Sequence, residues 1–493
     1  MRLSALVRDL PGLVGAAGDI GVEITRLATD SRQREPLDGS LFFCVSGARF
    51  DAHDFAPQVI GRGAAALVVE RILPDIAAPQ VQVESVRGAM GHIAAAFYGH
   101  PAKSMALAGI TGTKGKTTST YLLKAIMEAS GRKCGLIGTT GSLIGETMVS
   151  SGLTTPDPVD LHRTLRRMAD EGVTFCAMEI SAHAIDMRRL DGLEFDCVAF
   201  TNISHDHLDY FGDMDTYWRT KRRVFDSAYA RRAAFNADDE RAKGMMEGVE
   251  IPYTTYGIRE ECDLNARNIE ITEDGVSFEL TRRGQPGAAV ALRLTGMFNV
   301  YNSMTAASLA LALDAPMETI KAGLESVRAV PGRVEALDTR TPYKVILDYS
   351  HVPAALESIL RVVREFARKR VLVVFGCGGD RDREKRPVMG EIAGRLADYS
   401  ILTSDNPRNE DPGEILREVE QGIKRTSGGY EVIENRREAI RRALTIAREG
   451  DVIVLAGKGH ETYQEIRGVK KPFDEKIVIK ELLEEMNIAR GAV

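Results

Sequence analysis

The stretch SMALAGITGTKGKTT, residues 104–118, decides the fold of this chain. It begins with an apolar run that is typical of a buried strand and continues into a turn rich in glycine and threonine. A helical pattern then follows as far as Gly131, a residue type that commonly ends a helix. Glycines let backbone N–H groups turn toward phosphate oxygens, and the start of the helix adds positive potential. The pattern predicts a phosphate-binding loop between a strand and a helix.

Two side chains of this loop suit a nucleoside triphosphate. Lys116 can neutralise the β- and γ-phosphate oxygens, and the Thr117 hydroxyl can be a ligand of Mg²⁺. The spacing departs from the common GxxxxGKS/T pattern, because Ile110 stands at the first glycine position. A glycine-rich turn with a chance lysine is the alternative interpretation. Kinases, switch GTPases, motors and ligases all use such a loop, so other residues must indicate the reaction.

Polar side chains follow further apolar runs of the central region. Glu179 lies in MEISAH, residues 178–183, and His207 lies in the next such segment. A carboxylate just after a buried strand is where a phosphate-loop enzyme holds Mg²⁺. A solvent-facing strand end and a surface histidine are the plainer interpretations. Lys221, with two arginines after it, is by itself typical of the basic face of a helix.

Size and composition limit the class of protein. With 493 residues the chain should hold two to four domains, and its 44% apolar and 27% charged residues are typical of a soluble globular protein. The net charge of -6, without a long basic block, indicates no nucleic-acid surface. No signal peptide and no apolar stretch near the ~20 residues of a membrane span are found. Six scattered cysteines suit reduced thiols in the cytoplasm.

The order of apolar runs predicts an α/β protein of three domains. Residues 1–100 alternate short runs and turns, residues 101–335 carry the phosphate loop on a mostly parallel sheet, and residues 336–493 alternate strands and helices as a doubly wound, Rossmann-like domain. Residues 266–296 alternate polar and apolar positions, which indicates antiparallel hairpins at a sheet edge.

A series of motifs spans nearly the whole chain and resembles the Mur ligase family. The motifs occur in this order: TDSR at 29–32, GTKGKTT at 112–118, TTPD at 154–157, MEISAH at 178–183, DHLDYFGDM at 206–214, GMFNVYN at 296–302, PGRVE at 331–335, LDYSHVPAALE at 347–357, FGCGGDRDREKRP at 375–387, SDNPRNEDP at 404–412 and AGKGHE at 456–461.

The resemblance implies a reaction and its cofactors. An ATP-dependent ligase would join diaminopimelate to UDP-N-acetylmuramoyl-L-alanyl-D-glutamate through an acyl phosphate, in the synthesis of peptidoglycan precursors. Thr117 and Glu179 would bind one Mg²⁺, and Glu179, His207 and a carbamylated Lys221 a second. With Lys116 and Arg333, the residues Glu179, His207 and Lys221 would be the catalytic set. The resemblance further implies that ATP is bound by Gly112, Thr113, Lys114, Gly115, Lys116, Thr117, Thr118, Asn299, Asn302, Arg333, Asp348 and His351.

Substrate residues are implied in two regions. Ser31 would lie near the uridine, and Thr154, Thr155, Ser181 and Arg189 would hold the sugar-peptide end. Three loops of the third domain would hold the amino acid through Arg381, Asp405, Asn406, Pro407, Arg408, Gly457 and Glu461. Arginines can grip the two carboxylates of diaminopimelate, and acidic side chains can accept from its ammonium groups. In the family, an arginine at the position of Arg408 accompanies diaminopimelate. A helix cap or a surface ion pair is the alternative role for Arg408.

Other functions stay open at this point. Within the family the chain could add lysine, or it could be a folylpolyglutamate-type ligase, although the latter is expected to lack the N-terminal domain. From another class, it could be a phosphate-loop switch or binding ATPase. We expect a monomer that acts on small-molecule substrates, without nucleic acid or membrane partners, and whose third domain closes on binding.

Overall fold

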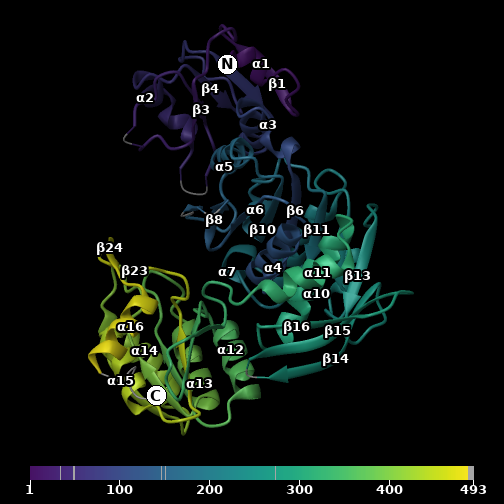
Figure 1. The fold of residues 1–493 in the computed structure, drawn as a ribbon. Coiled ribbons are helices and arrows are strands. Elements are labelled where there is room, and N and C mark those ends of the chain that lie inside the picture. Colours follow the sequence, from purple (N-terminus) through teal and green to yellow (C-terminus); the bar gives the residue numbers. More distant parts are fainter. Residues whose placement is uncertain (34, 48–49, 146, 150–151, 273, 487–493) are drawn as a thin grey trace. The chain divides into compact units, whose positions relative to one another are not determined.

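The computed structural model describes residues 1–33, 35–47, 50–145, 147–149, 152–272 and 274–486 (Figure 1). Its contacts divide the chain into two compact units. The first comprises Met1–Arg267, Leu280–Ala288 and Tyr301–Leu324, and the second comprises Asn268–Glu279, Ala289–Val300 and Glu325–Val493. The α/β class is confirmed, whereas the division into three domains at residues 100 and 335 stays a prediction. No helix within the described ranges is long and apolar enough to cross a membrane.

The N-terminal region folds around a five-stranded sheet in the order β1-β5-β4-β3-β2, in which only β1 is antiparallel to its neighbour. Consecutive side chains of a strand point to opposite faces, so Phe43 belongs to the core on one face and Phe42 to the core on the other. The elements are α1 (Leu3–Leu6), β1 (Leu13–Ala17), β2 (Arg26–Ala28), β3 (Ser40–Phe43), α2 (Ala56–Gly61), β4 (Ala66–Val69), β5 (Gln80–Val83) and α3 (Val86–Phe97).

The central sheet places the predicted phosphate loop at its middle. Strand β6 (Ala106–Thr111) lies between β11 (Cys197–Phe200) and β10 (Phe175–Ile180), and all three run parallel. The loop after β6 leads directly into α4 (Lys116–Ala129), as predicted from the sequence. Because parallel strands end at the same edge, the residues that follow β6, β10 and β11 meet there.

The remaining strands extend this sheet on both sides, in the order β16-β15-β14-β13-β12-β11-β6-β10-β7-β8-β9. Strands β14, β15 and β16 are consecutive neighbours at one edge, where the sequence predicted hairpins. The other central elements are β7 (Cys134–Gly138), β8 (Gly141–Ile144), β9 (Thr147–Val149), α5 (Pro158–Asp170), α6 (Ala182–Asp186), α7 (Leu208–Phe211), α8 (Met214–Arg222), β12 (Ala233–Asn236), α9 (Ala242–Met246), β13 (Tyr253–Gly257), β14 (Leu264–Thr272), β15 (Gly275–Arg282), β16 (Ala288–Leu292), α10 (Met297–Ala312) and α11 (Met317–Ser326).

The C-terminal sheet is doubly wound, as predicted. Its order is β17-β18-β22-β19-β20-β21, and only β17 is antiparallel to its neighbour. Helices α12, α13 and α14 pack on one face, and α15 and α16 on the other. The elements are β17 (Glu335–Leu337), β18 (Lys344–Asp348), α12 (Pro353–Phe366), β19 (Val371–Phe375), α13 (Lys385–Leu396), β20 (Tyr399–Leu402), α14 (Pro412–Ile423), β21 (Gly429–Val432), α15 (Arg436–Ile446), β22 (Val452–Ala456), β23 (Tyr463–Ile466), β24 (Val469–Pro472) and α16 (Glu475–Glu485).

A buried histidine makes the first unit sensitive to acid. His162 of α5 is fully buried, and neither of its ring nitrogens has a hydrogen-bond partner among the described residues. Burial, together with the charges of His100 and His92, lowers the pKa of His162 to about 4. In the unfolded chain the imidazole takes up its proton near pH 6.5, so acid favours the unfolded state between these two values.

We predict that the free energy of unfolding falls by about 3 kcal/mol through this group as the pH drops from 6.5 to 4. Full stability from this group is present above pH 6.5, because both states are then neutral. Denaturant unfolding across this pH range would measure the effect. A His162→Leu variant should lose this part of the pH dependence, whereas the same substitution at the exposed His205 should keep it. Equal pH profiles for His162→Leu and the wild type would contradict the prediction.

Candidate active site

Two glycines of the phosphate loop leave no space for a side chain. Gly112 has a φ of 144°, and a Cβ atom there would lie 1.9 Å from Thr201 Oγ1. Gly115 has a φ of 86° at the start of α4, where a Cβ atom would lie 2.4 Å from Asn302 Oδ1. Both positions therefore need glycine for conformation and for space. The tight packing fixes the loop before any ligand arrives.

The segment after β11 holds the loop from the side. The Lys114 N–H donates to Asn202 Oδ1 over 3.0 Å, and the Thr201 hydroxyl donates to Lys114 O over 2.7 Å. Lys116 folds back over the loop, and its Nζ donates to Gly112 O and Thr113 O over 2.9 and 2.8 Å. The ammonium group thus lies beside the backbone groups predicted to surround the phosphates.

Glu179 is a fully buried carboxylate at the end of β10. It accepts hydrogen bonds from the Thr117 hydroxyl over 3.0 Å, from the Thr139 N–H over 2.9 Å and from the Thr139 hydroxyl over 3.1 Å. The structure therefore brings together the two residues predicted to bind the first Mg²⁺. Hydroxyl and carboxylate oxygens are the ligands that Mg²⁺ prefers, so this pair fits such an ion.

The residues predicted to hold the sugar-peptide end form one hydrogen-bonded group beside Glu179. The Thr155 hydroxyl donates to Glu179 O over 2.8 Å and accepts from the Ser181 N–H over 3.1 Å. Arg189 donates to Thr155 O over 3.0 Å, and its Nε lies 2.8 Å from Asp157 Oδ1. Thr154 joins through Thr139, whose hydroxyl lies 3.2 Å away.

Lys221 is buried in α8 and reaches the phosphate loop. Its Nζ donates to Gly112 O over 2.9 Å and lies 4.8 Å from the centre of the Tyr217 ring. The rings of Tyr217 and His207 are 6.2 Å apart, so two of the predicted metal ligands border the same tyrosine. Burial lowers the pKa of Lys221 well below its ordinary range, and the charge of Lys116 lowers it further.

Predicted nucleotide residues lie in both units. In the first unit, Asn302 borders Gly115 and accepts from the Ser119 hydroxyl over 3.5 Å. In the second, Asn299 donates to Thr295 O over 2.9 Å.

Three further predicted nucleotide residues gather around Tyr349 in the second unit. The Arg333 guanidinium lies 5.3 Å from the centre of the Tyr349 ring, and His351 Nδ1 lies 2.8 Å from Tyr349 O. Asp348 precedes the tyrosine, and its carboxylate accepts from the Val334 N–H over 2.9 Å. Arg333, Asp348 and His351 therefore share one site on the C-terminal sheet.

The TDSR segment is held by Arg62, the residue that follows the C-terminal end of α2. Arg62 donates from NH1 to Ser31 O and from NH2 to Glu35 O, the latter over 3.1 Å. This contact shapes the loop that carries Ser31, the residue predicted near the uridine.

The loops after β20 and β22 converge on a buried lysine. Lys458 Nζ donates to Asn406 Oδ1 over 3.1 Å and to Tyr463 O over 2.7 Å, and lies 3.3 Å from carboxylate oxygens of both Asp405 and Glu461. The Asn406 amide in turn donates to Glu461 Oε2 over 2.9 Å. The predicted acidic and amide residues are thus gathered into one cluster.

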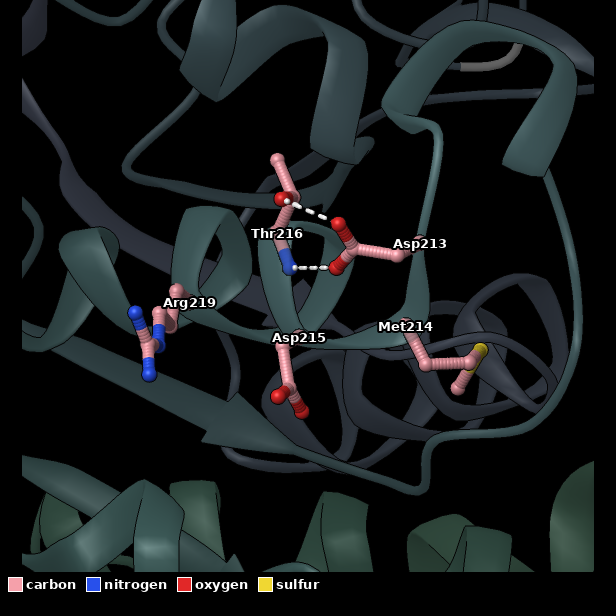
Figure 2. Close-up of a pocket in the computed structure, with 5 residues that line it drawn as sticks. All are labelled: Asp213, Met214, Asp215, Thr216 and Arg219. Atoms are coloured by element: carbon pink, nitrogen blue, oxygen red, sulfur yellow. Dashed lines mark hydrogen bonds between the residues drawn. The ribbon is translucent and has the colours of Figure 1, made fainter.

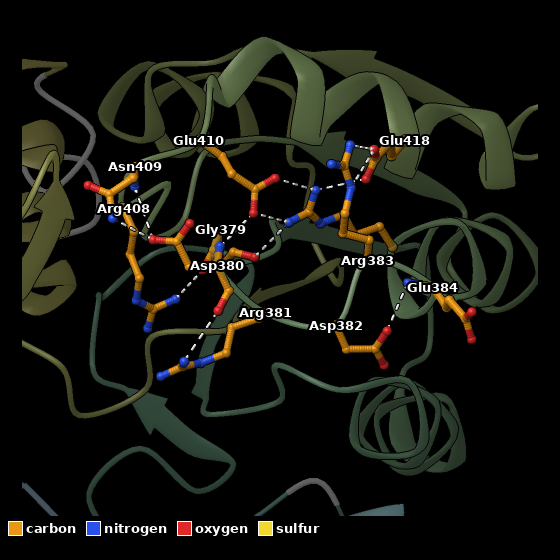
Figure 3. Close-up of polar contacts among 12 residues, drawn as sticks. Gly379, Asp380, Arg381, Asp382, Arg383, Glu384, Arg408, Asn409, Glu410 and Glu418 are labelled. Carbon is orange, nitrogen blue, oxygen red and sulfur yellow. Dashed lines mark hydrogen bonds and ion pairs between the residues drawn. The ribbon is translucent and has the colours of Figure 1, made fainter. Parts of the chain in front are cut away.

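The two predicted carboxylate-binding arginines belong to neighbouring loops (Figure 3). Arg408 has a φ of 50°, donates from NH1 to Gly379 O over 2.7 Å, and its Nε lies 3.4 Å from Glu465 Oε2. Arg381 donates to Asp380 O over 3.3 Å. An ion pair was the alternative role for Arg408, and such a pair is present within the chain.

A pocket of about 440 Å³ lies at the start of α8 (Figure 2). It is lined by residues 213–216 and Arg219, none of which is a predicted site residue. Asp213 accepts from the N–H and hydroxyl of Thr216 over 2.7 and 3.2 Å, so its carboxylate caps the helix. Within the described part of the chain, no group of three or more His, Cys, Asp or Glu side chains is arranged to hold a metal.

Comparison with known proteins identifies the family. Residues 23–98 match the Mur ligase family catalytic domain, residues 110–310 the Mur ligase middle domain, and residues 332–459 the Mur ligase glutamate ligase domain. A UDP-N-acetylmuramoyl-L-alanyl-D-glutamate--2,6-diaminopimelate ligase from Geobacillus thermodenitrificans is 44% identical over 493 residues, which cover 98% of this chain and 100% of the relative. The chain belongs to the Mur ligase family. The predicted family and the predicted class, an ATP-dependent amide-bond ligase, are confirmed.

Further relatives and solved structures agree with this Mur ligase assignment. A ligase of the same name from Clostridium acetobutylicum is 39% identical over 491 residues, covering 99% of this chain and 100% of the relative. A solved UDP-N-acetylmuramoyl-L-alanyl-D-glutamate--2,6-diaminopimelate ligase has a TM-score of 0.67 at 30% identity and covers 94% of this chain and 95% of its own. A MurF ligase from Thermotoga maritima, solved with ADP, shares the fold with a TM-score of 0.61 at 19% identity, covering 95% and 98% of the two chains.

The structure adds residues to this Mur ligase site that the sequence did not single out. Thr139 contacts Glu179 twice, and the Tyr217 ring lies near both Lys221 and His207. Lys458 lies inside the AGKGHE motif, in which Gly457 and Glu461 were the predicted site residues. A lysine between two glycines gives no sign of burial, so only its contacts reveal its role.

We predict that Gly112→Ala weakens ATP binding by at least about tenfold, because the added Cβ atom meets Thr201 Oγ1 and must displace the loop. Gly131→Ala is the matched control, since Gly131 also has a positive φ but nothing within 4 Å of its Cβ position. The control should cost about 1 kcal/mol of stability and keep ATP affinity. Calorimetric titration with ATP would measure both variants. Unchanged affinity in Gly112→Ala would rule out this loop as the phosphate site.

Proposed function

We propose that this Mur ligase joins meso-2,6-diaminopimelate to UDP-N-acetylmuramoyl-L-alanyl-D-glutamate, with ATP converted to ADP and phosphate. The observation that carries the proposal is full-length similarity, at 44% and 39% identity, to relatives named for this reaction. The phosphate loop supplies a nucleotide site, and the C-terminal loops supply charges of both signs for a zwitterionic diamino diacid. We further propose that it works as a monomer in the cytoplasm.

The reaction needs an activated carboxylate. The terminal carboxylate of the UDP-linked dipeptide attacks the γ-phosphorus of ATP, which forms an acyl phosphate and releases ADP. An amino group of diaminopimelate then attacks the acyl carbon, the C–O bond to phosphate breaks, and the amine loses a proton. Lys116 stabilises charge that develops on the phosphate oxygens, and Arg333 is proposed to assist from the second unit. The protein thus acts mainly by positioning and charge stabilisation.

Thr117 and Glu179 are the proposed ligands of the first Mg²⁺. Their oxygens already lie 3.0 Å apart, and both side chains are buried at the strand edge. When bound, Mg²⁺ supplies positive charge that offsets the negative charge of the transferring phosphoryl group. Glu179, His207 and Lys221 are proposed for the second ion.

We propose that Lys221 carries a carbamate in the active enzyme. Lys221 and Lys116 both donate to Gly112 O, so two amines share one acceptor in a buried place. Two neighbouring ammonium groups repel each other at low dielectric. The uncharged amine adds to CO₂ and loses a proton, so a carbamate anion replaces a potential cation; this relieves the repulsion and provides oxygen ligands for a metal ion.

The amino acid is proposed to bind at the loops of the C-terminal sheet. Arg381 and Arg408 would receive its carboxylates, and Asp405 and Glu461 its ammonium groups, while Asn406 and Lys458 hold the acidic pair in place. Pro407 and Gly457 shape the backbone beside them. Lysine lacks the distal carboxylate, so it would leave one arginine without its ligand partner.

We predict phosphate release and a product mass gain with meso-diaminopimelate, and neither with L-lysine, when ATP, Mg²⁺ and the UDP-linked dipeptide are present. Arg408→Gln should raise the KM for diaminopimelate about 10- to 100-fold, because a charge-assisted hydrogen bond is worth about 1.5–3 kcal/mol. Arg467→Gln is the control, because Arg467 is an exposed arginine whose backbone N–H donates to Arg408 O. A mass gain with lysine would refute the proposed substrate, and phosphate release without any amino acid would favour a switch or binding ATPase.

We predict a carbamate signal in the ¹³C NMR spectrum of the enzyme supplied with labelled bicarbonate. The signal should be missing in Lys221→Arg, because a guanidinium does not form this adduct under the same conditions, and it should persist in Lys243→Arg, which changes an exposed lysine. Loss of the signal together with loss of ligase activity would support the proposed metal ligand. A signal that survives in Lys221→Arg would assign the carbamate elsewhere.

A further inference from the structure

Polar contacts tie together two loops at the carboxyl edge of the C-terminal sheet (Figure 3). Residues 376–384 follow β19 and carry Arg381, and residues 403–411 follow β20 and carry Arg408. Besides the bond from Arg408 to Gly379 O, the Asn409 amide donates to Asp380 Oδ2 over 2.7 Å. The loops are therefore connected directly on the side where the two predicted ligand-binding arginines lie.

Arg386 connects the same loops from inside the protein. Its side chain is fully buried, and its guanidinium donates from NH1 to Glu410 Oε2 over 2.9 Å and from NH2 to Glu410 Oε1 over 2.8 Å. The same group donates to Gly378 O over 3.3 Å and to Glu418 Oε2 over 2.7 Å. The paired bonds to Glu410 fix both distance and orientation, which a single bond would not do.

The helices that carry this arginine and Glu418 cannot shift easily. A Cβ atom at Gly422 would lie 1.7 Å from Pro387 O, and one at Gly390 would lie 2.1 Å from Val419 O. Helices α13 and α14 therefore touch through their backbones, next to Arg386 at the start of α13. The guanidinium is held at a fixed place, and Glu410 is held by it.

The charges of this cluster favour the paired state. Glu410 and Glu418 flank one buried cation, and the hydrogen bonds from Arg386 hold the pKa of Glu410 below its usual range. Glu410 also accepts from the Asp380 N–H, so its carboxylate binds the first loop as well as Arg386. Removing the charge of Glu410 leaves the buried Arg386 with Glu418 as its remaining carboxylate in this cluster, which is more costly than losing a surface ion pair.

We infer that the Arg386–Glu410 ion pair is a positioning element that sets the separation of Arg381 and Arg408 and thereby the length of diamino diacid that the enzyme accepts. The inference rests on the proposed function, because it assigns the two arginines to the carboxylates of that substrate. In this proposal, neither Arg386 nor Glu410 contacts the substrate. Their effect is carried by the two loops that they join.

Glu410→Gln is the principal test, since glutamine keeps the shape and one acceptor oxygen but loses the charge and the paired bonds. We expect the KM for meso-diaminopimelate to rise about tenfold, with the KM values for ATP and the UDP-linked dipeptide within about twofold of wild type. The preference for diaminopimelate over a diamino diacid one methylene shorter is the ratio of the two kcat/KM values. This ratio should fall by about fivefold or more. Arg386→Lys, which cannot make the paired bonds, should act in the same direction.

Arg383→Gln is the matched control. Arg383 is exposed, belongs to the same cluster and bonds to Glu418. Its substitution leaves the ion pair of Arg386 with Glu410 intact. It should keep both the KM for diaminopimelate and the length preference. Unchanged length preference in Glu410→Gln, or an equal loss with all three substrates, would overturn the positioning role.

Hydrogen exchange gives a readout that does not need the reaction. Glu410→Gln should speed amide exchange in residues 376–384 and 403–411, whereas Arg383→Gln should not. Unchanged exchange in both loops would also overturn the inference. A wild-type enzyme that ignores diaminopimelate would instead refute the proposed function and the assigned ligand, and the exchange rates would still decide whether the pair holds the loops together.

Discussion

The close approach of Gly112 to the segment after β11 is the constraint on which the rest of the site depends. With no side chain at this position, the loop can lie against Thr201 and Asn202, and its carbonyl can accept from both Lys116 and Lys221. The same approach brings the start of α4 to the strand edge, where Thr117 meets Glu179. Any shift of this loop would separate the nucleotide residues from the carboxylate that is proposed to share their metal ion.

The groups that surround buried basic side chains differ from one part of the chain to another. Lys221 has a lowered pKa and bonds to a carbonyl, whereas Lys458 and Arg386 are each surrounded by two carboxylates. The first arrangement leaves an amine that can change its chemical state. The second keeps a fixed cation that orders neighbouring loops. Burial alone therefore does not indicate a role, and the groups around the charge decide it.

The sequence predicted the parts of the fold in which local pattern and tertiary structure agree. The run from residue 104 to Gly131 and the alternation from residue 344 to 459 have strong apolar periodicity, and both became the expected strands and helices. Strands β23 and β24 were not predicted, because their polar, partly exposed residues show no apolar alternation. Helix α16 was likewise missed, although Ile479 and Leu482 pack into the core.

The candidate site was predictable where a residue type and its local sequence pattern together indicate a chemical role. A lysine and threonine in a glycine-rich loop, or a carboxylate after a strand, can be found without coordinates. Thr139, Arg386, Glu410 and Lys458 could not, because each acts through partners that are distant in sequence or through burial. Arg386 and Glu410, for example, are separated by a strand and most of a helix, and only the tight contact of α13 with α14 shows why they meet.

The ion pair of Arg408 with Glu465 means that the carboxylate proposed to bind at Arg408 would meet an arginine that is already paired. The internal carboxylate is tethered a few ångströms away, so it competes at a very high effective concentration. A ligand carboxylate at this position would have to displace Glu465, and Glu465 can return to Arg408 as soon as the ligand begins to leave. An exchange of this kind would favour a short residence time of the bound group, because a competing partner is always within reach.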